Sequence, residues 1–371
     1  MKLNLSGREL YRSFNLVSGI ISATSVKQVL QGVRIEAKGH FLELVATDLE
    51  VLVRCRLSLK DVMEENDGLV VPAARVNSIL REWVNEENVS IVTESGNCVL
   101  RARGSYFKVV GENIADFPVV CISKVNDFVE IGGEIIGSMV GKVIHAVSQV
   151  KARGPLCGVF VRVKGDDLIM VAADGNRMSY VKRKIVNTSG TAAEGILTVK
   201  SLSFLQKFVS EYGGVIKIGL SDSQAQFIGE NGEVISQLIE GQFPRYEDVI
   251  PTGSKEKVEI NVGELVSKVR MTSHMTIEGY RVVRFLFKSG KLVIMSKTAE
   301  VGESEVEIPV LYSGQDIEMN FNPDYILDAL KTADGETVTM EFNDNSSAVL
   351  FRTGHEQFSV IMPIELKQGI H

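Results

Sequence analysis

The stretch Ala46-Thr47-Asp48-Leu49 returns as Ala173-Asp174-Gly175, with the two aspartates 126 residues apart. The dipeptide Phe117-Pro118 returns as Phe243-Pro244 at the same spacing, and Met362-Pro363 closes a third copy 119 residues later. A period of about 125 in a chain of 371 residues predicts three tandem copies of one domain, with almost nothing left over.

The repeat extends beyond these short matches. The second half of each third contains a helix start, an apolar helix, alternating strands and a terminal strand, and Pro72 and Pro323 suit helix starts because proline lacks an N–H there. Loops near 121–127 and 250–256 are the predicted junctions. We therefore predict three domains, an N-terminal, a middle and a C-terminal one, over residues 1–124, 125–252 and 253–371.

Composition limits the class of protein. Hydrophobic residues make up 44% of the chain, which is enough for real cores. The four cysteines show no metal-ligand spacing, so we expect no disulfide framework, no metal and no cofactor. Residues 1–5 lack the apolar stretch of a secretory signal, and the longest apolar segment, 131–150, contains charged residues. These features predict a soluble cytoplasmic protein.

Periodicity of 3.6 residues predicts six helices, at 8–21, 73–85, 133–151, 199–212, 262–276 and 322–333. On these helices Leu10, Phe14 and Val17 are predicted to form an apolar stripe that packs on a sheet, and Lys142, His145 and Gln149 a polar stripe. They contain eleven Lys and Arg against seven Asp and Glu, a balance of +4, whereas the whole chain has a net charge of −7. The remainder therefore has a charge of −11. If the helices share one surface, that surface is basic on an acidic body and suits a phosphate backbone, although any single helix could simply present a solvated polar face.

Segments of alternating or β-branched residues between the helices predict antiparallel strands, with Lys288-Ser289-Gly290 as a hairpin turn. The segments are 41–45, 50–57, 168–172, 178–185, 284–287 and 291–295. Two helices and roughly eight strands in each third predict an α+β architecture, with the helices packed on antiparallel sheets.

No catalytic constellation is evident. The five histidines are scattered and lack metalloprotease spacing. Asp48 and Asp174 recur at matching positions, but an aspartate after a strand commonly closes a turn, and the repeat itself explains the recurrence. We expect a protein that is not an enzyme.

Several ordered motifs resemble one family, the bacterial DNA sliding clamp, which is the β subunit of the DNA polymerase III holoenzyme. The resemblance spans the whole chain in order. The motifs that carry it are Thr47-Asp48-Leu49-Glu50, Ala115-Asp116-Phe117-Pro118, Ala173-Asp174-Gly175-Asn176-Arg177, Glu240-Gly241-Gln242-Phe243-Pro244-Arg245-Tyr246, Tyr312-Ser313-Gly314, Phe321-Asn322-Pro323-Asp324-Tyr325-Ile326-Leu327 and Val360-Ile361-Met362-Pro363-Ile364.

The resemblance implies three DNA-clamp domains per chain, paired head to tail in a homodimer that forms a ring of six domains around duplex DNA. Such a ring is a processivity factor: it slides without sequence specificity and tethers the replicative polymerase, the clamp loader and repair proteins that carry clamp-binding peptides. Two alternatives remain: a sequence-specific DNA-binding protein, disfavoured because the cations are spread over six helices, and an enzyme on a repeated β scaffold.

The resemblance also implies a subunit interface between the first third of one chain and the last third of its partner. One side comprises Arg75, Ile79, Phe107 and Val109, and the other comprises His274, Met275, Glu300, Glu303 and Glu305. Phe107 and Met275 are expected to form the apolar contact, and Arg75 to form an ion pair with the glutamates.

A peptide-binding pocket between the middle and last thirds is implied in the same way. Its positions are Leu156, Ala173, Gly175, Asn176, Arg177, Met178, Pro244, Val249, Ser347, Val360, Met362, Pro363 and Ile364. Apolar side chains and Met suit a groove for Leu and Phe anchors from several partners. The chain departs from the family pattern at Ala173, Asn176 and Asp248, which leaves the peptide preference open.

The last implied site is the surface that faces DNA. Better-known members carry an Arg at the position of Thr24, and Lys27, Lys151 and Arg153 are nearby substitutes. The full predicted set is Arg8, Arg12, Lys27, Arg81, Lys142, Gln149, Lys151, Arg153, Lys200, Lys207 and Lys268.

Overall fold

The computed structural model describes residues 2–22, 25, 27–277, 279, 281–299 and 301–365, with the backbone alone at 61–66. The chain forms two compact units. Unit 1 comprises Met1–Gly137 and Ile185–Ile239, and unit 2 comprises Ser138–Lys184 and Glu240–His371. The division falls within helix α3 (Gly133–Val143). The two boundaries between the three predicted domains therefore stay a prediction.

Unit 1 contains helices α1 (Gly7–Ser18), α2 (Ala73–Glu82) and α4 (Val199–Tyr212). Its strands are β1 (Lys2–Leu5), β2 (Gly32–Thr47), β3 (Val51–Pro72), β4 (Val89–Glu94), β5 (Asn97–Ala102), β6 (Ser105–Val110), β7 (Val129–Gly132), β11 (Ala193–Thr198), β12 (Val215–Leu220), β13 (Gln224–Gly229) and β14 (Gly232–Gln237). Two of its sheets have the strand orders β1-β4-β5-β6 and β2-β3-β14-β13-β12-β7.

Unit 2 contains helices α5 (Val262–Ser273) and α6 (Pro323–Lys331). Its strands are β8 (Gly158–Lys164), β9 (Asp167–Ala173), β10 (Arg177–Lys184), β15 (Glu256–Asn261), β16 (Val283–Lys288), β17 (Lys291–Thr298), β18 (Gly302–Pro309), β19 (Ile317–Phe321), β20 (Thr337–Phe342), β21 (Val349–Gly354) and β22 (Gln357–Ile361). They pair in the orders β8-β9-β10-β22-β21-β20-β15 and β18-β17-β16-β19.

The sheets join segments that are far apart in the sequence. In unit 1, β3 pairs with β14, with Val51 opposite Ser236. In unit 2, β10 pairs with β22, with Arg177 opposite Ile361. Both pairings are antiparallel and begin directly after an Asp-containing turn. Each unit therefore contains an antiparallel strand pairing between successive repeats.

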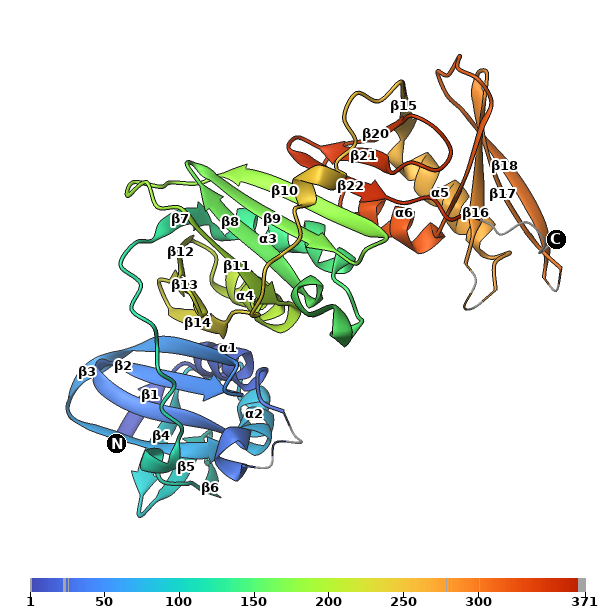
Figure 1. Cartoon of the computed structure of the whole chain (residues 1–371). Helices are drawn as coiled ribbons and strands as arrows, with labels where there is room; N and C mark the ends of the chain where they lie inside the picture. Colours follow the sequence, from blue (N-terminus) through green and yellow to red (C-terminus); the bar gives the residue numbers. More distant parts are fainter. Residues whose placement is uncertain are drawn as a thin grey trace. The chain divides into compact units, whose positions relative to one another are not determined.

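The helices bury the predicted apolar stripes. Leu10, Phe14 and Val17 of α1 are fully buried in unit 1. In unit 2, α5 and α6 pack against each other and against neighbouring strands, as Figure 1 shows, and Leu265 and Val269 join one core of apolar and aromatic side chains. Side-chain oxygens of Asn261 and Asn322 cap these two helices by accepting backbone N–H groups.

Two expectations about local structure have different outcomes. The hairpin at 288–290 is confirmed: Lys288 pairs with Lys291, and Gly290 has a φ of 81°. The helix predicted over 133–151 is wrong in its second half, because α3 ends at Val143 and short 3-10 turns follow at Ile144–Ala146 and Lys151–Cys157. Lys142, His145 and Gln149 therefore do not form one helical stripe.

Candidate peptide pocket, subunit interface and DNA-facing surface

Strand register brings part of the predicted peptide pocket together in unit 2. Met178 on β10 lies between Ala173 on β9 and Val360 on β22. The backbone N–H of Met362 donates to the Asn176 carbonyl over 2.9 Å, so the chain after β22 is bound directly to the turn before β10. Met178 and Val360 are buried, whereas Met362 is 42% exposed. An exposed apolar side chain therefore stands beside a buried apolar row.

The turn at 174–177 is closed by its own aspartate. Asp174 Oδ1 accepts the backbone N–H groups of Asn176 over 2.9 Å and of Arg177 over 3.1 Å. Gly175 has a φ of 93°, and a β-carbon there would lie 2.5 Å from Nη1 of Arg153. The position therefore needs glycine both for its backbone and for the guanidinium group above it.

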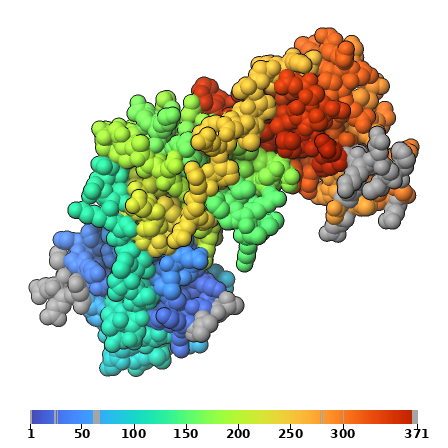
Figure 2. All heavy atoms as spheres, in the orientation of Figure 1, coloured from blue at the N-terminus to red at the C-terminus, as the bar shows by residue number. Residues whose placement is uncertain are grey.

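The remaining pocket positions lie on neighbouring segments of unit 2. Pro244 is exposed just before the 3-10 turn Tyr246–Val249, and Val249 is 54% exposed. Figure 2 shows the segment after residue 240, in yellow and orange, on the surface of the molecule. Leu156 lies in the turn Lys151–Cys157 and accepts the Ser148 N–H through its carbonyl.

Ser347 lies between β20 and β21 in a turn centred on Asp344. The backbone N–H of Ser346, together with the hydroxyl and N–H of Ser347, lowers the pKa of Asp344 to about 2. Pro363 and Ile364 follow Met362, and the Ile364 N–H donates to the Asn320 carbonyl over 2.7 Å. These bonds fix the backbone of the turn and of the chain after β22.

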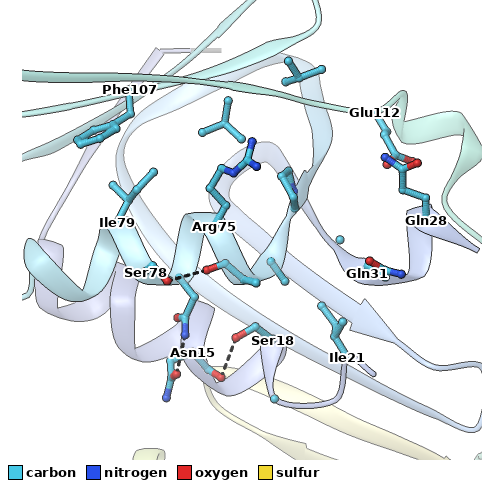
Figure 3. Close-up of a pocket in the computed structure, with 18 of the residues that line it drawn as sticks. Asn15, Ser18, Ile21, Gln28, Gln31, Arg75, Ser78, Ile79, Phe107 and Glu112 are labelled. Atoms are coloured by element: carbon cyan, nitrogen blue, oxygen red, sulfur yellow. Dashed lines mark hydrogen bonds between the residues drawn. The ribbon is translucent and has the colours of Figure 1, made fainter. Parts of the chain in front are cut away.

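The first half of the predicted subunit interface lies in unit 1 beside β6, the edge strand of its sheet. Phe107 is 42% exposed and packs edge-to-face on Trp83, with ring centroids 5.4 Å apart. Arg75, Ile79 and Val109 line an open groove of about 1440 Å³ next to it. Figure 3 shows Phe107 close to Ile79, with Arg75 pointing into the groove.

The second half lies in unit 2 beside β18, also an edge strand. Glu303 and Glu305 are exposed, and Lys297 Nζ lies 3.7 Å from Glu303 Oε2. The Met275 carbonyl accepts the Thr298 hydroxyl over 2.7 Å, which holds the chain after α5 against the β17–β18 hairpin. His274 caps α5 and is exposed. Glu300 lies outside the described residues.

Most of the predicted DNA-facing residues are exposed. Arg8, Arg12, Arg81 and Lys207 lie on helices of unit 1, and Lys27 precedes a 3-10 turn there. In unit 2, Gln149, Lys151 and Arg153 are exposed, and Lys268 of α5 is half-buried. Lys200 is half-buried and forms an ion pair with Asp48. Thr24 lies outside the described residues.

The prediction for Lys142 is wrong. Its side chain is only 5% exposed and forms an ion pair with Asp334 and a hydrogen bond with Gln357. The charge is therefore neutralised within unit 2 and is not available to a phosphate.

Models of known protein families match nearly the whole chain. The models of the N-terminal, central and C-terminal domains of the DNA polymerase III beta subunit match residues 1–121, 130–245 and 247–365, in that order. The chain belongs to the DNA polymerase III beta subunit family. Three consecutive family domains in one chain agree with the threefold repeat.

Relatives in the beta subunit family match over their full length. The beta sliding clamps of Chlamydia muridarum and Pseudomonas aeruginosa are 26% and 27% identical, and each alignment covers 99% of this chain and at least 99% of the relative. The crystal structure of the Pseudomonas aeruginosa DNA polymerase sliding clamp with ligand has a TM-score of 0.93 at 27% identity, covering 99% of this chain and all of that one.

Among the residues that the structure describes, no group of three or more His, Cys, Asp and Glu is arranged to hold a metal ion. Among the described helices, none is both long enough and apolar enough to cross a membrane.

Sequence reasoning missed three residues of unit 2 that contact Arg177, one of the predicted pocket positions. Asp328 and Tyr325 come from α6, and His145 comes from the 3-10 turn after α3. Burial lowers the pKa of His145, and the charge of Arg177 lowers it further. The motif containing Tyr325 was visible in the sequence, but nothing there indicated that Arg177 contacts Asp328, which is 151 residues away.

Proposed function

We propose that the chain is a sliding clamp: a ring-shaped, non-catalytic processivity factor that encircles duplex DNA and tethers the replicative polymerase. The observation that carries this proposal is the match of three tandem beta subunit domains, in order, across nearly the whole chain. The cytoplasm is the proposed compartment, because bacterial chromosomes are replicated there.

The proposed homodimer follows from two sheet edges. Each internal repeat junction pairs two strands antiparallel, β3 with β14 and β10 with β22. The strand of the first repeat that matches β14 and β22 is β6, and the last repeat ends its sheet with β18. Pairing of β6 with β18 of a second copy would form the same antiparallel junction between the first repeat of one chain and the last repeat of the other. Two such junctions would close a head-to-tail dimer.

Side-chain faces determine how these edges meet. Phe107 points toward Trp83, and Val306 and Ile308 point into the core of unit 2. Because opposite residues of antiparallel strands share a face, Phe107 and Val109 pack on the inner side with Ser304 and Val306. Lys108 then lies on the outer side with Glu303 and Glu305. Exposed ion pairs are worth about 0–1 kcal/mol, so the apolar contact of Phe107 with Met275 dominates.

The DNA-facing surface is weakly basic, which suits sliding. Arg8 and Lys207 are exposed, whereas Arg12 Nε lies 2.6 Å from Glu211 Oε2 and its guanidinium stacks on Tyr212. Strong phosphate contacts would slow movement along DNA, because each must break for the ring to advance. Lys27, Arg81, Gln149, Lys151, Arg153, Lys200 and Lys268 complete the proposed set.

The proposed pocket of unit 2 captures clamp-binding peptides of the polymerase catalytic subunit, the clamp loader and repair proteins. Its support is the apolar row of Ala173, Met178 and Val360 beside the exposed Met362. Such a surface accepts Leu and Phe anchors, and Met adapts to different sequences.

Topological binding is tested by comparing circular and linear DNA. Protein loaded onto a nicked circular plasmid should co-elute with the plasmid in gel filtration and should be lost when a restriction enzyme linearises it. Equal retention on linear DNA would indicate a sequence-specific binder and would contradict the proposal.

The subunit interface is tested by reversing its apolar contact. Phe107→Arg combined with Met275→Arg should give a soluble monomer by light scattering, because two like charges would then face each other in place of the apolar contact. Leu311→Arg is a matched control, since Leu311 is 96% exposed and lies outside both edge strands. A double variant that stays dimeric would contradict this interface.

A further inference from the structure

Each nitrogen of the Arg177 guanidinium group donates one hydrogen bond within unit 2. Its Nε donates to Asp174 Oδ2 over 3.0 Å, its Nη1 donates to Asp328 Oδ2 over 2.7 Å, and its Nη2 donates to the His145 carbonyl. The group also stacks on Tyr325, 4.4 Å from the ring centroid, and the side chain is only 12% exposed. Each of its three nitrogens therefore has a partner before any peptide arrives.

These contacts continue to the wall of the pocket. Asp174, which accepts from the Arg177 side chain, also closes the turn that contains Gly175 and Asn176. The Asn176 carbonyl in turn accepts the N–H of Met362. A continuous series of hydrogen bonds thus leads from Asp328 on α6 through Arg177 and the turn to Met362.

We propose that Asp328 is a positioning residue of the peptide pocket, and that Arg177 is a structural anchor of the pocket instead of a ligand for the peptide. Asp328 holds Arg177, which holds the 174–177 turn and thereby the backbone of Met362. This inference rests on the peptide pocket of the proposed function. It also gives α6 a role in binding although α6 itself contributes none of the predicted pocket positions.

The physical basis is the cost of leaving a buried guanidinium without a partner. Loss of the Asp328 carboxylate leaves Nη1 without its charged acceptor at a site that is mostly shielded from water. Arg177 then takes other acceptors, and the turn and Met362 gain alternative conformations. A peptide must restrict these conformations when it binds, which lowers its affinity.

The experiment uses the full-length dimer and a fluorescein-labelled peptide that carries Leu and Phe anchors, with binding measured by anisotropy. Asp328→Asn should weaken binding by about fivefold to tenfold, a change of about 1–1.4 kcal/mol. Asp328→Glu should restore most of the affinity, because its carboxylate can still reach the guanidinium. The dimer mass and the retention on circular DNA should not change in either variant.

Asp324→Asn is the matched control on the same helix. Asp324 forms an ion pair at 2.9 Å with Arg281, whose side chain is 38% exposed and which is not one of the Arg177 contacts, so removal of this carboxylate should leave peptide affinity unchanged. In an Arg177→Lys background, Asp328→Asn should add little further loss, because the two residues act through one contact.

The outcomes separate this inference from the function on which it rests. Wild-type protein that does not bind the peptide would overturn the pocket itself, and this inference with it. Wild-type binding combined with equal binding by Asp328→Asn would overturn the positioning role alone. An equal loss in Asp328→Asn, Asp328→Glu and Asp324→Asn, accompanied by a lower melting temperature, would also overturn it, because α6 would then act only through stability.

Discussion

The turns at Asp48 in unit 1 and Asp174 in unit 2 have the same backbone hydrogen bonds but different surroundings. Asp48 Oδ1 accepts the N–H groups of Glu50 and Val51, as Asp174 Oδ1 accepts those of Asn176 and Arg177. The other carboxylate oxygen of Asp48 binds Lys200 on a helix, whereas that of Asp174 binds Arg177 within its own turn. The repeat fixes the turn, and the second partner of the aspartate differs between the units.

The residue that follows each aspartate also differs between the two turns. Leu49 has a φ of 79° and is 47% exposed, so a side chain is accommodated at a strained backbone position. At Gly175 the equivalent space is occupied by Arg153. The turn in unit 1 thus serves mainly to begin a strand pairing, whereas the turn in unit 2 is also part of the proposed pocket.

The largest expected difference between the units concerns their lysine ion pairs. Lys142→Ala should lower the free energy of unfolding by about 2–3 kcal/mol, because the side-chain oxygen of the buried Gln357 loses its Lys142 donor. Lys200→Ala should cost about 0–1 kcal/mol, because 39% of the Lys200 side chain is exposed. Urea denaturation of both variants measures the difference.

Lys142→Met serves as the control for side-chain volume, and it should keep more stability than Lys142→Ala. If Lys142→Ala and Lys200→Ala lowered the free energy of unfolding by equally small amounts, the predicted difference between the two ion pairs would be contradicted.

Exchanging the residues after the aspartates should have a smaller effect. Gly175→Leu should cost about 1–2 kcal/mol for the positive φ and should also displace Arg153. Leu49→Gly should change stability by less than about 1 kcal/mol, because relief of strain and the added flexibility of glycine oppose each other. Thermal denaturation measures both changes.

Gly165→Leu separates the two causes in unit 2. Gly165 has a φ of 57°, and a β-carbon added there would meet no neighbouring atom within 4 Å, so this position carries the backbone penalty without the clash. A loss at Gly175 no larger than that at Gly165 would rule out a contribution from Arg153.

The smallest expected effect is a pH dependence confined to unit 2. Because burial lowers the pKa of His145, the unfolded chain binds a proton there before the folded chain does. This contribution to stability is complete above the unfolded pKa of about 6.5 and is lost as the pH falls through the folded pKa. Arg177 opposes the charged form, whereas Asp328 and Asp174 favour it.

His145→Gln should therefore lose less stability than the wild type between about pH 7.5 and about pH 5.5, as measured by melting temperature. His355→Gln is the control, because His355 is exposed in the β21–β22 turn. Parallel curves for all three proteins would contradict the assignment to His145.

Local patterns in the sequence predicted much of the fold. The period near 125 indicated the repeats, and the stripe Leu10, Phe14 and Val17 was confirmed as a buried helix face. The end of α3 was predicted wrongly because the apolar spacing continues to residue 150, although β-branched Val147 and Val150 weaken a helix there. A periodic pattern shows which residues are buried, but not where a helix gives way to extended chain.

The sites were less predictable because their contacts cross long distances in sequence. Lys142 looked like a surface cation, and its partner Asp334 is 192 residues away. The resemblance placed Arg177 in the pocket but gave no information about Asp328 or the His145 carbonyl. Only the fold brings these groups together.

The exposed glutamates on the outer face of β18 affect how a newly synthesised chain behaves before it dimerises. A bare strand edge invites indiscriminate pairing and aggregation. Two copies of β18 brought together would set Glu303, Glu305 and Glu307 of one against the same carboxylates of the other, and their repulsion disfavours that encounter. In the proposed dimer, this acidic edge would favour pairing with β6, which carries Lys108, over pairing with a second copy of β18.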